Sequence, residues 1–305
     1  MKAKLLTLLL GGCLSALATV ADAAGLTGTL AKVAETKTFT IGHRESAVPL
    51  SYYDDQQKAV GFAVELCQKV ADAVKEQLKL PSMEVKYVPV NGSTRIPLLV
   101  NGTIDIECGT TTNNVEREKQ VAFSTTTYVA ALRFASRVSD KFGKLPDLTG
   151  HTVTSTAGSD NLESTNSLNV SRSLKMSVLP TKDFGEGFLT LDTGRADALF
   201  LDDIVLAGLI ANSKDPSKYV ISDQALTSEP YALMMRRDDP AFKKLVDDTL
   251  AKLYASGEAA ALYKKWFESP VPPKNINMHL PPSKALQAVW QHPTDSADPK
   301  AYPTD

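Results

Sequence analysis

Histidine and cysteine are scarce in this chain of 305 residues, which has four histidines and three cysteines. The histidines lack the spacing of metal ligands, and no Gly-x-Ser-x-Gly segment marks a nucleophilic serine. We therefore expect no metal site, no cofactor and no catalytic residues. The chain also lacks an excess of positive charge, with 33 lysines and arginines against 35 acidic residues. No basic cluster alternates with aromatic residues, so we expect no nucleic-acid partner.

The first 24 residues have the pattern of a cleaved secretory signal peptide. Lys2 and Lys4 give a positively charged start, an apolar run follows, and Ala-Asp-Ala before Ala24 is a small-residue cleavage site. The segment LGGC resembles a lipobox, which would make Cys13 a lipid anchor, but the apolar run continues past it. We expect an exported, freely soluble mature protein, since no later segment has the roughly 20 apolar residues of a membrane span.

Two cysteines, Cys67 and Cys108, remain after the predicted leader. In an oxidising compartment they could pair, although two cysteines do not make a disulfide scaffold. The other interpretation is that each is buried as a small hydrophobic residue. The sequence leaves both interpretations open.

Strands and helices are predicted to alternate along the first part of the mature chain. Residues 28–42 form a short helix leading into a strand, and 61–78 have apolar residues close to helical spacing. The alternation of 83–90 predicts a strand. A short helix over 94–102 and a strand over 103–108 follow. This order is typical of a parallel sheet with helices on its faces.

A second unit with the same alternation begins near Leu145. After it the chain returns as a strand over 229–239 and continues as two helices broken at Ser256 and Gly257, and from Pro270 we expect an extended polar tail. The second unit is predicted as a loop and strand (145–159), a helix (from 159), a strand (176–180), a helix (183–194) and a strand (196–203).

Strand-like segments near 125–135 and 226–236 are predicted to connect the two units. The fold class is therefore α/β, with two Rossmann-like lobes joined by a two-stranded hinge. A cleft between the lobes, at the carboxyl ends of the strands, is where open α/β sheets bind ligands. We assign 25–128 plus 230–305 to lobe 1 and 129–229 to lobe 2.

Three arginines and an aspartate fall at the sheet edges that would face this cleft. Arg44 follows the first strand, Arg95 begins a helix, and Arg117 lies just after the strand that ends near Cys108. Asp202 closes the last strand of the second unit. For a single arginine a solvated surface position is the common case, and a lone Asp there is most often a helix cap. One such residue would carry little information, but three arginines on one unit facing an acid on the other form a pattern at the predicted cleft.

These segments resemble the type II periplasmic solute-binding proteins of ABC importers, family 3, and most closely the glutamate/aspartate-binding subgroup. The resemblance covers nearly all of the mature chain and implies a periplasmic protein that delivers an acidic amino acid to a membrane permease. It rests on GHRESAVPLSYYD, VGFAVEL, TRIPLLVNGTIDIECGTTTNNVEREKQVAFS, GRADALFLDD and YKKWF.

The resemblance assigns a role to each candidate site residue. It makes Arg117 the clamp on the ligand α-carboxylate, with the backbone and hydroxyls of Thr110 and Thr112, because a guanidinium offers two parallel donors to a carboxylate. Arg44 and Arg95 match the arginines that hold the side-chain carboxylate. A further match is Asp202, at the position of the acid that accepts the ligand ammonium group.

Three departures from the family pattern alter the wall of the cleft. The segment with Ser159 and Asp160 stands where the family has SGTT, Phe184 replaces a histidine, and Gly92 replaces a serine. Three arginines against Asp202 and Asp160 leave a net charge of +1, which would balance the −1 of glutamate. The three arginines therefore favour an acidic amino acid, while the departures leave its exact identity open.

Two other functions share this fold. A sensory module that docks on a receptor has the same cleft, and some dehydratases resemble it too. A cleft of arginines with one acid suits binding better than turnover, so we expect a binding protein and not an enzyme. We also expect the protein to be a monomer. Tyr52 and Tyr53 either line the cleft or pack in the core.

Overall fold

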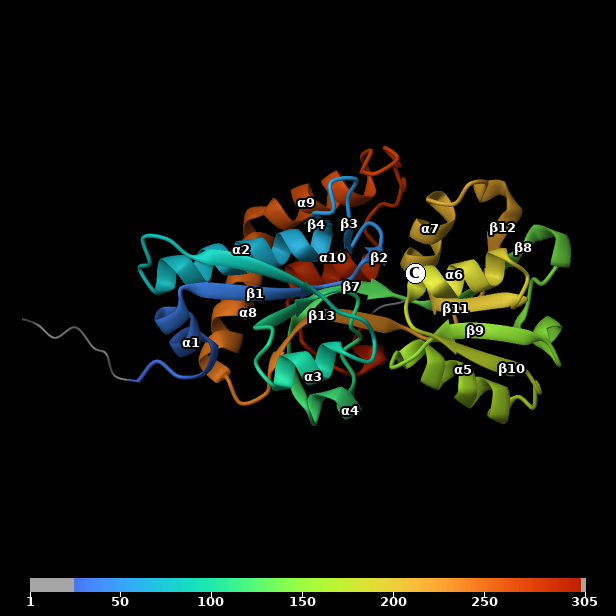
Figure 1. Cartoon of the computed structure of the whole chain (residues 1–305), viewed down its shortest axis with the longest axis horizontal. Helices are drawn as coiled ribbons and strands as arrows, with labels where there is room; N and C mark the ends of the chain where they lie inside the picture. The colour runs from blue at the N-terminus through green and yellow to red at the C-terminus, as the bar shows by residue number, and fades with distance from the viewer. Residues whose placement is uncertain (1–24, 303–305) are drawn as a thin grey trace, which may run out of the picture.

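Two five-stranded sheets organise the protein, and helices flank both of them (Figure 1). The computed structural model describes residues 25–302, so the predicted signal peptide and the lipobox alternative lie outside the described residues. The first sheet contains β1 (Thr38–His43), β5 (Glu84–Pro89), β6 (Ile106–Cys108), β7 (Val121–Ala130) and β13 (Glu229–Arg236). Its order is β5-β1-β6-β13-β7, with β1, β5 and β6 parallel and β13 antiparallel to its neighbours.

The second sheet repeats this plan. It contains β8 (Leu132–Arg137), β9 (Thr152–Thr156), β10 (Ser177–Thr181), β11 (Ala198–Asp202) and β12 (Tyr219–Ile221). Its order is β10-β9-β11-β8-β12, in which β9, β10 and β11 are parallel and β8 is antiparallel to both β11 and β12. A small antiparallel sheet precedes α2 in the first lobe and contains β2 (Ser46–Ala47), β3 (Ser51–Tyr53) and β4 (Ala59–Val60).

Helices connect the parallel strands, as the sequence predicts. Asp239 accepts a hydrogen bond from the Phe242 amide and caps α8, and Gly257, at φ +78°, ends α8 in the left-handed conformation that favours glycine. The helices are α1 (Gly28–Thr36), α2 (Phe62–Gln77), α3 (Arg95–Val100), α4 (Val115–Glu118), α5 (Asp160–Ser171), α6 (Phe184–Asp192), α7 (Asp203–Ala211), α8 (Pro240–Ser256), α9 (Glu258–Phe267) and α10 (Lys284–Gln291).

The last of these helices corrects one prediction. The segment after Pro270 was expected to be an extended tail, but α10 buries Ala285, Leu286 and Val289 in the core of the first lobe. This apolar spacing is helical, and Ser283 caps the helix by accepting from the Leu286 amide. Prolines lie on either side of this helix of eight residues, and their density is typical of an extended segment.

The chain crosses between the sheets twice. β7 runs into β8 with only Ala131 between them, and the segment after β12 returns into β13. These two crossings form the two-stranded connection between the lobes (Figure 1). The division into 25–128 plus 230–305 and 129–229 remains our proposal for the lobe boundaries. Within residues 25–302, no helix is both long enough and apolar enough to span a membrane.

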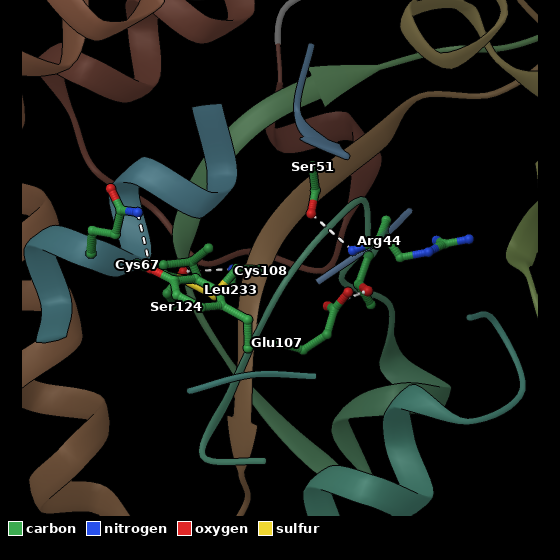
Figure 2. The surroundings of a disulfide bond; sticks show 10 residues. Arg44, Ser51, Cys67, Glu107, Cys108, Ser124 and Leu233 are labelled. Atoms are coloured by element: carbon green, nitrogen blue, oxygen red, sulfur yellow. Dashed lines mark hydrogen bonds between the residues drawn. A yellow bond between two sulfur atoms is a disulfide. The ribbon is translucent and has the colours of Figure 1, made fainter. Parts of the chain in front are cut away.

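A disulfide joins Cys67 of α2 to Cys108 at the end of β6 (Figure 2). Both cysteines are fully buried and paired, so of the two interpretations left open by the sequence the disulfide is the one observed. Side chains alternate along a strand, so Ile106 and Cys108 face the core under α2 while Glu107 points to the opposite face. The disulfide therefore anchors the strand that leads into the loop with Thr110 and Thr112.

We expect the double variant Cys67→Ala, Cys108→Ala to fold but to be less stable. Loss of a cross-link between residues 41 apart in sequence should lower the free energy of unfolding by about 2–4 kcal/mol, because the unfolded chain regains its freedom. Urea unfolding followed by circular dichroism measures this loss. Equal stability of the double variant and the oxidised wild type would contradict a closed disulfide.

Candidate functional site

One small cavity between the lobes brings together the nine candidate site residues with assigned or inferred ligand contacts. It lies where the carboxyl ends of strands from both sheets meet, as expected for an open α/β fold. One further residue, Asn161, was not predicted. The lining is formed by Arg44, Arg95, Thr110, Thr112, Arg117, Ser159, Asp160, Asn161, Phe184 and Asp202.

The three arginines are buried rather than solvated. Arg44, Arg95 and Arg117 are 3%, 2% and 8% exposed, so the surface interpretation of Arg44 is wrong. Arg44 donates from Nη1 to the Thr110 hydroxyl at 3.2 Å, and Arg117 donates from Nη1 to the Thr112 carbonyl at 2.9 Å. Each guanidinium keeps further N–H groups for a ligand. Burial lowers the pKa of Arg95 to about 9, with the Arg117 charge as the second cause.

An acid that was not predicted, Glu107, lies close to Arg44 and Arg95. The Thr111 hydroxyl donates to Glu107 Oε2 at 2.6 Å and accepts a hydrogen bond from Arg95 Nη1. Glu107 is fully buried, and a Cβ placed at Gly109 would lie 2.2 Å from its Oε1 and 2.8 Å from Cγ of Arg44. In Figure 2 the side chain of Glu107 extends away from the disulfide toward Arg44.

The opposite wall carries Asp202, the last residue of β11. It occupies the N-cap position of α7, but its side chain makes no capping hydrogen bond, so the capping interpretation is wrong. Its Oδ2 accepts from the Tyr231 hydroxyl and from Asn161 Nδ2, the latter at 3.2 Å. Its Oδ1 is buried and has no hydrogen-bond partner among the described residues. Burial raises the pKa of Asp202 to about 6.

Ser159 and Asp160 open α5 at the rim of the cavity. The Ser159 hydroxyl caps the helix, since it accepts from the Leu162 amide at 3.1 Å and donates to the Thr156 carbonyl at 2.6 Å. The Asp160 carboxylate is partly exposed and accepts from Asn114 Nδ2 across the cleft at 2.9 Å. Both side chains are thus engaged by protein groups, although they line the cavity.

Two of the departures from the family pattern lie at the contact between the lobes. The Phe184 ring packs on Arg44, with the guanidinium carbon 4.0 Å from the ring centroid, a favourable cation–π distance. Gly92 lies against the backbone of Ala157 and Gly158, and a Cβ on Gly92 would lie 2.4 Å from the Ala157 carbonyl oxygen. A serine at position 92 does not fit this arrangement of the lobes.

The structure changes the charge balance inferred from sequence. Asp160 lies at the rim with Asn114, whereas Glu107, which the sequence-based charge sum does not contain, is fully buried beside the arginines. The buried charged residues around the cavity are the three arginines, Asp202 and Glu107, and their net charge is again +1. A charged residue between Ile106 and Cys108 in an otherwise apolar strand was the signal that sequence reasoning missed.

The remaining candidates are placed as follows. Tyr52 packs in the core and donates its hydroxyl to the Pro272 carbonyl at 2.8 Å, outside the cavity. Asn161 and Asn114 carried no sequence signal, because a single asparagine near a helix start is most often a cap. Across residues 25–302, no group of three or more His, Cys, Asp or Glu side chains is arranged to hold a metal ion.

The comparison with known families agrees with this architecture. Residues 39–269 match the model of the bacterial extracellular solute-binding proteins, family 3, and the chain belongs to that family. It is 43% identical over 293 residues to the glutamate/aspartate import solute-binding protein of Escherichia coli (strain K12), covering 95% of this chain and 97% of that protein. It is 42% identical over 273 residues to the L-glutamate/L-aspartate-binding protein of Pseudomonas aeruginosa, covering 89% and 90%.

Solved structures share the two-lobed fold. A mutant of ArgBP from T. maritima aligns with a TM-score of 0.68 at 27% identity, over 78% of this chain and 98% of that one. The ancestral amino acid-binding protein AncCDT-1, described as a precursor of cyclohexadienyl dehydratase, aligns with a TM-score of 0.67 at 25% identity, over 78% and 99%. Type II periplasmic amino-acid-binding architecture is therefore the fold of this protein.

We expect the Asp202 carboxyl group to titrate near pH 6 when the lobes are arranged as in this structure, because burial disfavours its ionised form. The Asn161 amide favours the ionised form, so Asn161→Ala should raise this pKa by about 1 to 2. Carbon-13 NMR of labelled aspartate carboxyl groups measures both values. Asp202→Asn assigns the signal by removing it, and a titration near the usual aspartate value would contradict the buried geometry.

Proposed function

We propose that this protein binds an acidic amino acid, glutamate or aspartate, in the cavity between its lobes and delivers it to the permease of an ABC importer. The observation that carries the proposal is the set of three buried arginines facing one buried acid. Such a site is stabilised when an anion meets the guanidinium groups, because unpaired buried charges are costly.

The roles that the resemblance implies are compatible with the positions of these side chains in the cavity. Arg117, with Thr110 and Thr112, would hold the α-carboxylate, and the free Oδ1 of Asp202 would accept from the ammonium group. Arg44 and Arg95, on the same wall, would hold the distal carboxylate. The lobe-two side of the cavity would be completed by Ser159, Asp160, Asn161 and Phe184.

The named relatives support this ligand class and the transport role. Proteins that are 42% and 43% identical, over nearly their whole length, are described as binding or importing glutamate and aspartate. The predicted leader supports a periplasmic location. The role proposed for the mature chain is that of a monomeric binding protein without catalytic activity, and analysis of glutamate incubated with it should return glutamate unchanged.

Discrimination between acids and their amides tests the proposal. Glutamine is nearly isosteric with glutamate but neutral, so it would leave Arg44 and Arg95 poorly satisfied. Loss of two hydrogen bonds to charged groups, each worth roughly 1.5–3 kcal/mol, should weaken binding by about a hundredfold or more. We expect Arg44→Gln and Arg95→Gln to lose the preference for glutamate over glutamine. Arg117→Ala should lose the binding of every amino acid, because all share the α-carboxylate.

Isothermal calorimetry with glutamate, aspartate, glutamine and asparagine measures these affinities. The exposed Arg172 of lobe two provides a matched control, because Arg172→Gln removes the same charge away from the cavity and should leave the affinities unchanged. Equal affinity of the wild type for glutamate and glutamine would contradict the proposal that the ligand is an acidic amino acid.

Closure of the lobes depends on the absence of a side chain at position 92. We expect Gly92→Ala to weaken glutamate binding by about tenfold to a hundredfold, because overpacking costs roughly 1–3 kcal/mol and the Ala157 carbonyl is backbone. Gly143→Ala is the control, since a Cβ there meets nothing within 4 Å. Calorimetry and thermal unfolding of both variants separate binding from stability. Unchanged affinity in Gly92→Ala would show that the ligand-bound lobes do not approach this closely.

A further inference from the structure

Glu107 is a buried acid for which the proposed ligand contacts have no use. It lies on β6 between β1 and β13, level with Gly42 and Met234, on the face of the sheet that carries α3. Its Oε2 accepts from Thr111, while its Oε1 has no hydrogen-bond partner among the described residues. Among the described residues, no Lys or Arg nitrogen lies within ion-pair distance of Glu107. Its negative charge therefore acts on Arg44 and Arg95 at longer range, and not through a direct ion pair with one of them.

The negative charge of Glu107 stabilises the protonated forms of Arg44 and Arg95, the two arginines of the proposed distal-carboxylate subsite. Glu107 is the strongest nearby charge that favours the protonated form of Arg44, and it also opposes the Arg117 and Arg44 charges acting on Arg95. Thr111 links Glu107 to Arg95 by consecutive hydrogen bonds, which fix the orientation of the guanidinium group. Two positive charges and one negative charge leave this subsite with a charge of +1.

We propose that Glu107 is a positioning residue that sets the charge of the distal subsite, so that the site accepts a distal group with one negative charge and rejects one with two. This inference rests on the proposed binding of acidic amino acids and adds the residue that limits their charge. When a carboxylate binds in a subsite of charge +1, the total charge of subsite and ligand is zero. A dianionic phosphate would leave a total charge of −1 beside Glu107. Such an excess is costly where water is largely excluded.

O-Phospho-L-serine is the probe, because its phosphorus occupies the chain position of the distal carboxyl carbon of glutamate. At pH 8 its phosphate carries two charges, since the second phosphate pKa is about 6. We expect the wild type to bind glutamate about a hundredfold or more tighter than phosphoserine by calorimetry. Glu107→Gln keeps the shape and raises the subsite charge to +2, so it should bind phosphoserine about tenfold or more tighter than the wild type does.

Two further variants separate charge from structure. Asp105→Asn also removes a fully buried carboxyl group from lobe one, but Asp105 pairs with Lys32 and Arg236 outside the cavity. It should lower the unfolding temperature without changing the ratio of the two affinities. Thr111→Val keeps the Glu107 charge and breaks its link to Arg95, so it should weaken glutamate binding and still reject phosphoserine.

The outcomes that overturn the proposal are distinct. If Glu107→Gln weakens glutamate and phosphoserine by the same factor, Glu107 has only a structural role. Gain of phosphoserine binding in Thr111→Val would also overturn it, and this test stands even if Glu107→Gln fails to fold. A wild type that binds neither glutamate nor aspartate removes the proposed function, and this inference fails with it.

Discussion

The burial of three guanidinium groups in one cleft is the constraint on which the site depends. Arg44, Arg95 and Arg117 reach the cavity from three different segments of lobe one, and all are less than a tenth exposed. Buried charges of like sign repel one another, so the protein supplies partial compensation through Glu107 and through hydroxyl and carbonyl acceptors. An anionic ligand would supply the rest, which ties binding to closure of the lobes.

The contacts between the lobes explain where this chain departs from its family pattern. Phe184 lies on the Arg44 guanidinium, Asn114 donates to Asp160, and Gly92 meets the backbone at Gly158. All three contacts join lobe one to lobe two around the cavity. The departures inferred from sequence therefore lie on surfaces where the lobes meet, beside the cavity that the three arginines line.

Much of the fold could be predicted because its signals are local. The apolar spacing of α2, the alternation in β5 and the break at Gly257 each act within one or two turns of chain. The helix α10 was missed because prolines surround a short apolar pattern. The nine candidate site residues were found by resemblance and by their places at strand ends, and the structure brings them together.

Residue order is enough to predict the alternation of strands and helices, the family and the arginines at the strand ends, because each of these signals is local in the chain. The pairing of Cys67 with Cys108, the contact of Asp160 with Asn114 and the place of Glu107 beside the arginines become visible only in the folded protein. These are contacts between residues distant in sequence or on opposite lobes. Their partners are fixed by the packing of the sheets and helices, which no local pattern records.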